Sequence, residues 1–191
     1  MLKLEALIAS FFLITPLLGA ASTPIVAGAR QEAKKIMEIK SSAFENDHSI
    51  PKKYTGEGED VSPPLQISTV PPKTKSFALI MDDPDAPPGT WIHWLIYDLP
   101  PDTRNLREGL PRKEAFRDGA KQGLCWGVDS FERVGYYGPL PPPGKPHHYF
   151  FKVYAIDKVL ELPPRATKAE LLKAMSGHVL ASAELVGIYQ R

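Results

Sequence analysis

Two histidines and a tyrosine begin an apolar segment that directly follows a proline-rich loop. In the stretch GKPHHYFFKVYAID, one residue separates His147 from Tyr149, so an extended chain places both side chains on the same face. A protonated imidazole donates a hydrogen bond from each ring nitrogen, and a phenol donates one more. These residue types at this spacing therefore suit a small anion such as phosphate.

A second group of polar residues follows another apolar segment. The run SFALIMDDPDAPPG contains Asp82, Asp83 and Asp85, and His93 stands near the start of the next apolar segment. If the two segments pair as neighbouring strands, the acidic turn and His93 reach the same rim of a sheet. His93 needs a polar partner on its otherwise apolar face. We expect Asp83 to orient this ring and to keep it charged.

The loop before His147 is the most proline-rich part of the chain. Five prolines lie in the eight residues from Pro139 to Pro146, and Gly138 precedes them. Prolines fix the shape of a loop before a ligand binds, which lowers the entropy cost of binding, and glycine lets a ligand approach the backbone. The alternative is that the prolines only stiffen the loop and that the nearby acids only bind turn amides.

Other kinds of chemistry lack a motif in this chain. The sequence has no paired-histidine helix, no cysteine pair, no calcium loop, no G-x-S-x-G elbow and no G-x-x-x-x-G-K-[ST] phosphate loop. Cys125 is a single cysteine beside a tryptophan, which is typical of a packed hydrophobe. We expect no catalytic residue, no metal and no cofactor. A phosphoester hydrolase that uses the same histidines is the less favoured alternative.

Several apolar segments are expected to be strands. Residues 77–81, 91–99 and 147–157 are short apolar or alternating runs bounded by prolines, and 180–191 resembles a closing strand. Residues 48–68 contain several glycines and prolines and are expected to form a long loop rich in turns.

The segment 91–99 is apolar on both faces. Simple alternation places His93 with Leu95 on one face, and Trp94 with Ile96 on the other. The segment is therefore expected to lie centrally between two layers.

One helix has clear end signals. Thr167 and Glu170 have the spacing of a capping box before LLKAM, and Gly177 can end the helix. Proline makes up 20 of 191 residues, about twice its usual share of about 5%. The sequence predicts a mainly β fold: an antiparallel β-sandwich of two sheets with long proline-rich loops and one or two short helices near the C-terminus.

Length, charge and the first residues bound the organisation of the chain. We expect residues 30–191 to form a single domain. Residues 1–29 are expected to be a signal peptide or an N-terminal hydrophobic anchor plus linker. The reason is that the apolar stretch ALIASFFLITPLLGAA is shorter than a membrane span and ends in small residues. The protein is then exported to the periplasm or outside the cell, or is anchored to the membrane. With 23 basic and 22 acidic residues, the chain lacks the excess of positive charge that is typical of proteins that bind nucleic acid.

Several ordered motifs resemble those of one known family. They are DPDAP at 83–87, WIHW at 91–94, GYYGPLPPPGKPHHY at 135–149 and GHVLASAELVGIYQR at 177–191. Together they resemble the phosphatidylethanolamine-binding proteins, and most closely the bacterial and archaeal branch described as Raf-kinase-inhibitor-like. The resemblance covers about residues 36–191.

The resemblance implies a β-sandwich with a small pocket at one end that binds phosphate, acetate or a phospholipid head group. Carried over by position, its pocket residues are Asp83, Trp91, His93, Gly138, Pro139, His147 and Tyr149. The resemblance also makes Pro84 and Pro87 candidates for cis peptide bonds.

These observations favour a non-enzymatic binding protein with a small anion pocket. Its expected partner is a phosphate-containing small molecule or a phospholipid head group, and nucleic acid is not expected. The alternative is a protein-interaction module that inhibits an extracytoplasmic protease or kinase through the loop around 139–146.

Overall fold

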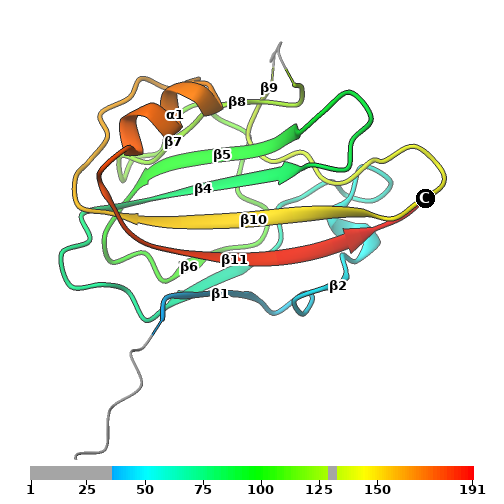
Figure 1. The fold of residues 1–191 in the computed structure, drawn as a ribbon, viewed down its shortest axis with the longest axis horizontal. Helices are drawn as coiled ribbons and strands as arrows, with labels where there is room; N and C mark the ends of the chain where they lie inside the picture. The colour runs from blue at the N-terminus through cyan, green and yellow to red at the C-terminus, as the bar shows by residue number, and fades with distance from the viewer. Residues whose placement is uncertain (1–35, 129–132) are drawn as a thin grey trace, which may run out of the picture. The chain divides into compact units, whose positions relative to one another are not determined.

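The computed structural model describes residues 36–128 and 133–191 (Figure 1). The chain divides after Lys34, and the fold described here is that of the second unit. The signal peptide or anchor predicted for 1–29 lies outside the described residues. Within those residues, no helix has both the length and the apolar character needed to cross a membrane.

Most described residues belong to β-sheets. The larger sheet has six strands in the order β2 (His48–Ser49), β11 (Val179–Tyr189), β10 (His147–Ile156), β4 (Ser76–Asp83), β5 (Trp91–Leu99) and β7 (Lys121–Gln122). Its pairs are antiparallel except for β2 with β11. The smaller sheet has the order β1 (Glu38–Ser41), β3 (Leu65–Ser68) and β6 (Asn105–Leu106), and a separate two-stranded ribbon joins β8 (Leu124–Cys125) to β9 (Arg133–Val134).

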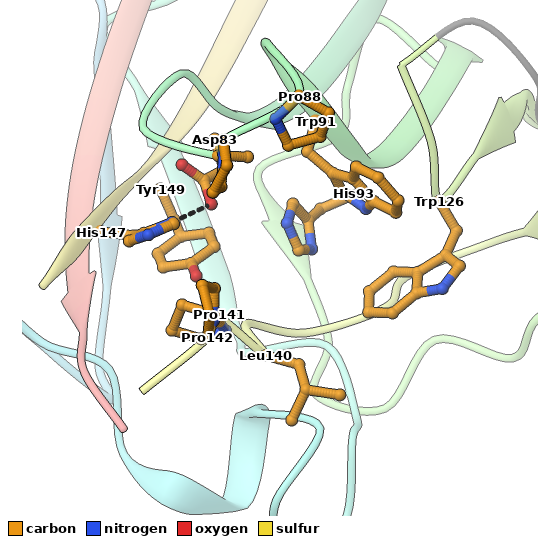
Figure 2. Close-up of a pocket in the computed structure, with 12 residues that line it drawn as sticks. Asp83, Pro88, Trp91, His93, Trp126, Leu140, Pro141, Pro142, His147 and Tyr149 are labelled. Carbon is orange, nitrogen blue, oxygen red and sulfur yellow. Dashed lines mark hydrogen bonds and ion pairs between the residues drawn. The ribbon is translucent and has the colours of Figure 1, made fainter. Parts of the chain in front are cut away.

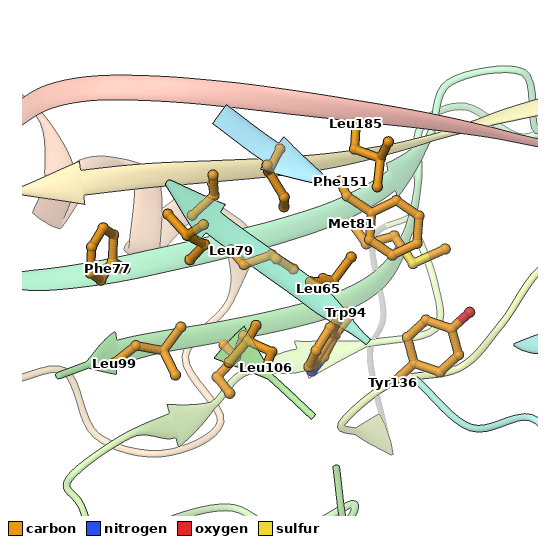
Figure 3. Packing of buried hydrophobic residues seen from close by; sticks show 14 of the residues in the cluster. Leu65, Phe77, Leu79, Met81, Trp94, Leu99, Leu106, Tyr136, Phe151 and Leu185 are labelled. Atoms are coloured by element: carbon orange, nitrogen blue, oxygen red, sulfur yellow. The ribbon is translucent and has the colours of Figure 1, made fainter. Parts of the chain in front are cut away.

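A first hydrophobic core joins the two larger sheets (Figure 3). Alternate residues of β4, Phe77, Leu79 and Met81, are fully buried against Leu65 and Ile67 of β3. Removing this apolar surface from water is the dominant stabilising contribution to such a fold. The predicted mainly β sandwich is confirmed.

A second core lies on the opposite face of the six-stranded sheet. The other residues of β4, Ala78 and Ile80, pack there with Leu171 of the helix α1 (Lys168–Met175). The predicted capping box is confirmed, since the Thr167 hydroxyl and the Glu170 carboxylate each accept a hydrogen bond from the other residue's backbone N–H. Helix α1 therefore covers one face of the sheet while the smaller sheet covers the other.

The strand β5 departs from simple alternation. The pairing register with β4 shifts between Met81 and Asp82, which leaves His93 as an extra residue in β5. Ile92 packs in the second core, while the His93 ring lies edge-on to Tyr149 of the first core, with 5.1 Å between ring centroids. The alternation predicted for 91–99 is wrong at this point, because the bulge arises from pairing with β4.

The segment 48–68 is more ordered than its composition predicts. A single 3-10 turn, η1 (Lys52–Tyr54), follows β2, and β3 forms the central strand of the smaller sheet. Leu65 and Ile67 of β3 are buried while Gln66 between them is exposed. The strand was not predicted, because Pro63 and Pro64 directly precede it and its alternation of buried and exposed residues is only four residues long.

Candidate functional site

A pocket of about 170 Å³ lies where β4 ends and its neighbours β5 and β10 begin (Figure 2). Both neighbours run antiparallel to β4, so their first residues meet its last residues at one rim of the sheet. The lining residues are Asp83, Ala86, Pro87, Pro88, Trp91, His93, Trp126, Leu140, Pro141, Pro142, His147 and Tyr149. Five of the seven residues predicted for the site are among them.

Asp83 and His147 form a buried pair at the base of this pocket. Nδ1 of His147 donates to Oδ2 of Asp83 at 2.7 Å, and both side chains are less than a tenth exposed. The other carboxylate oxygen accepts the backbone N–H of Asp85 at 2.8 Å. Both oxygens of Asp83 are therefore occupied, and His147 is left with only Nε2 for a ligand.

His93 has a different partner from the one predicted. Its Nδ1 lies 2.7 Å from the backbone carbonyl oxygen of Tyr137, which can only accept, so this nitrogen carries a proton. Burial lowers the pKa of His93, against the opposing effects of the Tyr137 carbonyl and of the carboxylates Asp83, Asp60 and Asp82. The expectation that Asp83 pairs with this ring and keeps it charged is wrong, because β10 brings His147 to that carboxylate instead.

The buried neutral ring of His93 gives stability a pH dependence. We expect the free energy of unfolding to fall as pH drops below about 6.5, the ordinary pKa of histidine, because the unfolded chain binds the proton more readily than the fold does. His93→Asn retains a donor toward the Tyr137 carbonyl and does not titrate. Urea unfolding at pH 7.5 and 5.5 should show a smaller pH difference for this variant than for the wild type, whereas equal differences would contradict the assignment.

Tyr149 carries the most unusual polar atom of the site. Its hydroxyl is buried and has no hydrogen-bond partner among the described residues. Burial, and after it the negative charge of Asp83, raises the pKa of Tyr149, so the group remains a neutral phenol. Tyr149 lines the pocket together with Pro141 and Pro142 of the proline-rich loop (Figure 2). The hydroxyl is close enough to the Asp83 carboxylate for that group to raise its pKa, but the two do not form a hydrogen bond of acceptable geometry, so the pocket contains a buried donor that a ligand can use.

Gly138 and Pro139, which the resemblance placed at the mouth of the pocket, are not among the lining residues. The backbone N–H of Gly138 donates to Oδ1 of Asp60 at 2.7 Å, and the Pro139 carbonyl accepts from the Gly56 N–H at 2.9 Å. These two residues hold the start of the loop. The loop forms the wall with the residues that follow them.

The walls of the pocket are mostly apolar. Leu140, Pro141 and Pro142 form one side, and Trp91 and Trp126 lie edge-on to each other with ring centroids 5.8 Å apart. Sequence reasoning missed Trp126, which lies outside the site motifs, next to Cys125. It also missed the three loop residues, although they lie within the proline-rich stretch that drew attention.

The rim of the pocket is held by hydrogen bonds from β10 and from the chain's last residues. The backbone N–H and Nδ1 of His148 both donate to Oδ2 of Asp85, at 2.9 and 2.7 Å, and the side-chain bond from His148 is the main cause of a lowered pKa for Asp85. Nη1 of Arg191 donates to the Pro141 carbonyl at 3.3 Å.

The resemblance made Pro84 and Pro87 candidates for cis peptide bonds. The peptide bonds before both residues are trans, as are all others in the described residues, so this expectation is wrong.

Among the residues that the structure describes, neither Cys125 nor any cluster of metal-binding side chains adds chemistry to this site. Cys125 is buried, its thiol donates to the Gly135 carbonyl at 3.0 Å, and burial raises its pKa to about 12. It is therefore a packed thiol rather than a nucleophile. Across residues 36–128 and 133–191, no three histidine, cysteine or acidic side chains are grouped as a metal ion would require.

A β-sandwich with a small, apolar-walled pocket and a few convergent polar groups has the form of a small-ligand binding protein. Residues 40–190 match the profile of the family described as phosphatidylethanolamine-binding protein. The chain belongs to this family, and its relatives place it among the bacterial and archaeal members.

Relatives and solved structures agree over most of the chain. The UPF0098 protein of Methanothermobacter thermautotrophicus is 47% identical over 155 residues, which are 81% of this chain and 99% of that protein. The UPF0098 protein of Aquifex aeolicus is 48% identical over 158 residues, covering 82% and 90%.

Two crystal structures have the same fold. The putative phosphatidylethanolamine-binding protein homolog CT736 of Chlamydia trachomatis superposes with a TM-score of 0.73 at 43% identity, covering 82% of this chain and 98% of that one. For E. coli YbcL, described as a member of the mammalian PEBP family, the TM-score is 0.70 at 30% identity, with 82% and 99% covered.

Proposed function

We propose that this protein is a non-enzymatic binding protein whose pocket holds a phosphate-like group, either free or at the head of a phospholipid. The observation that carries the proposal is the buried hydroxyl of Tyr149, which has no partner among the described residues. Leaving a buried donor unsatisfied costs about 1–3 kcal/mol. A ligand oxygen at this position would remove that cost.

The polar groups of the pocket fit a small anion. Tyr149 can donate its hydroxyl proton, and His147 gains a second N–H at Nε2 when it is protonated. Asp83 fixes the tautomer and the orientation of the His147 ring. The proposed donors come from one face of β10, at alternate positions.

The size of the pocket limits the ligand. Its volume of about 170 Å³ is below the range of about 300–1,000 Å³ that is typical for drug-sized ligands. The pocket can therefore hold a head group but not the acyl chains of a lipid. The tryptophan and proline walls provide apolar contacts for a short carbon substituent.

Binding without turnover is part of the proposal. The lining residues include no serine, cysteine or lysine, and the two groups best suited to attack a phosphoester, Asp83 and His147, are hydrogen-bonded to each other. Because the first residues have the composition of a signal peptide, the proposal places this binding in the periplasm or outside the cell, with a membrane-anchored form as the alternative.

Tyr149→Phe tests the proposal directly. We expect affinity for inorganic phosphate to fall about tenfold, because one hydrogen bond to a charged group is lost, and the free energy of unfolding to rise by up to about 1 kcal/mol, because a buried orphan hydroxyl is removed. Isothermal titration with phosphate and with glycerophosphoethanolamine measures the first effect, and urea unfolding measures the second.

The matched control is Tyr154→Phe, on the opposite face of the same strand. It should leave phosphate affinity unchanged. His147→Ala should abolish saturable binding. A folded wild-type protein that binds neither ligand would refute the proposal, and hydrolysis of a phosphoester panel that is lost in His147→Ala would favour the hydrolase instead.

A second candidate function is supported by the exposed loop at the pocket wall. Leu140 is 40% exposed although it is a large apolar residue, and prolines surround it in a loop held at both ends. Such a rigid apolar loop fits a protein-interaction module that inhibits an extracytoplasmic protease or kinase. Replacing 139–146 with a glycine-serine linker separates the two functions, since loss of a protein partner with intact phosphate binding favours the module.

A further inference from the structure

The hydrogen-bonding capacity of His93 is restricted by its backbone contact. Nδ1 must donate to the Tyr137 carbonyl, because a carbonyl oxygen cannot donate. A neutral ring with its proton on Nδ1 has a lone pair on Nε2. His93 then offers the pocket an acceptor and no donor.

The surroundings of His93 keep the ring neutral. It is 3% exposed, and the rings of Trp126 and Tyr149 lie edge-on to it at 5.5 and 5.1 Å between centroids. The charged groups that act on it are Asp83 and Asp82 of β4 and Asp60 before β3, while His147 and Tyr149 are the other titratable side chains of the pocket. The carboxylates favour a charged ring, but burial outweighs them and the pKa of His93 is lowered.

Asp83 adds a second acceptor to the same pocket. Its two oxygens already accept bonds from His147 and from the Asp85 backbone, so this carboxylate cannot donate to a ligand and repels ligands that carry several negative charges. The donors left for a ligand are the Tyr149 hydroxyl and, when protonated, Nε2 of His147. With His147 protonated, the pocket therefore contains two donors, from Tyr149 and His147, and one acceptor without a partner among the described residues, Nε2 of His93.

We infer that the pocket selects ligands that bring their own acidic proton: the monoanion of a phosphate monoester, or inorganic phosphate, in preference to a phosphate diester. Such a ligand donates its P–OH to Nε2 of His93 and accepts from Tyr149 and His147. A diester has no P–OH and leaves His93 without a partner. This inference rests on the proposed anion pocket and narrows its ligand class: of the two sources proposed above it favours free phosphate or a monoester over an intact phospholipid head group, which is a diester.

Methyl phosphate and dimethyl phosphate provide the test. At pH 6.5 a part of the methyl phosphate is a monoanion with the same charge as the diester, since the second pKa of a phosphate monoester is about 6. We expect methyl phosphate to bind about 10- to 100-fold more tightly, because the diester has no proton to donate to Nε2 of His93 when it fills the pocket. Equal affinities, or tighter binding of the diester, would overturn the inference while leaving the anion pocket intact.

His93→Asn distinguishes hydrogen bonding from simple size selection. Asparagine retains a donor for the Tyr137 carbonyl but removes the acceptor at the Nε2 position, so the preference for methyl phosphate should disappear. If the preference came from the bulk of the second methyl group, it would persist in this variant. His178→Asn, at an exposed ion pair with Asp157, is the control and should retain the wild-type preference.

A measurement on the wild-type protein makes the test independent of that variant's folding. The ¹⁵N chemical shifts of the histidine rings at pH 7 should show His93 protonated at Nδ1 alone, both free and with methyl phosphate bound. A doubly protonated His93 in either state would overturn the inference. If neither phosphate ester binds, the proposed function itself fails and the inference fails with it.

Discussion

Asp82→Ala is expected to lower the free energy of unfolding by about 3 kcal/mol. The carboxylate is 1% exposed and accepts Nζ of Lys152 at 2.8 Å and Nζ of Lys168 at 2.5 Å. It thereby joins β4 to the neighbouring strand β10 and to the first residue of α1. Without it, two ammonium groups with side chains that are 30% and 26% exposed remain close together without their shared partner.

Asp157→Ala is the matched control for this substitution. Asp157 also accepts an ion-pair hydrogen bond, from His178, but its side chain is 42% exposed, and exposed pairs contribute only about 0–1 kcal/mol. Urea unfolding of both variants at pH 7 measures the contrast. Equal losses of unfolding free energy would mean that solvent screens the charges of Asp82, Lys152 and Lys168.

Because Asp82 and Asp83 pair on different sides of the sheet, phosphate binding by Asp82→Ala should persist as long as the protein is folded.

Elements whose signals are local could be predicted from the sequence. The helix α1 depends on Thr167 and Glu170, three residues apart, and the capping box forms as predicted. The strand β10 alternates between the first core and the opposite face over its whole length, as HHYFFKVYAI indicates. In both cases the residues that determine the structure lie within a few positions of each other.

Features that depend on a neighbouring strand could not be predicted in this way. The bulge at His93 exists because the register in which β5 pairs with β4 shifts between Met81 and Asp82, and no residue in WIHW specifies it. Its consequence is functional, since it brings the His93 ring to the Tyr149 ring.

The main polar residues of the candidate site were predicted, but its apolar wall was largely missed and the hydrogen-bond partners were not predicted. Residue chemistry and spacing, and then the motif resemblance, identified Asp83, His93, His147 and Tyr149, and all four line the pocket. The hydrogen-bond partners were assigned wrongly, because chain proximity favoured Asp83 with His93. In the fold, the antiparallel pairing of β4 with β10 brings His147, 64 positions away in sequence, to that carboxylate.

Gly138→Ala is expected to lower the free energy of unfolding by about 2–3 kcal/mol and to abolish phosphate binding. A Cβ at this position would lie 2.1 Å from the Tyr54 carbonyl oxygen and 2.8 Å from the Thr55 Cα. Both are backbone atoms, and the Tyr54 carbonyl is also held by the hydroxyl of Tyr136 at 2.6 Å. The glycine must therefore move, and the pocket wall from Leu140 onward moves with it.

Gly144→Ala separates this steric effect from backbone strain in the same loop. Gly144 has a φ of +141°, but no atom lies within 4 Å of the Cβ that alanine would add. In this variant the free energy of unfolding should fall by about 1–2 kcal/mol, because alanine is strained at a positive φ, and phosphate binding should be retained. Urea unfolding and phosphate titration of the two variants give the comparison. If Gly138→Ala bound phosphate as the wild type does, the loop's contact with Tyr54 would not position the pocket wall, and the role assigned to Gly138 would be wrong.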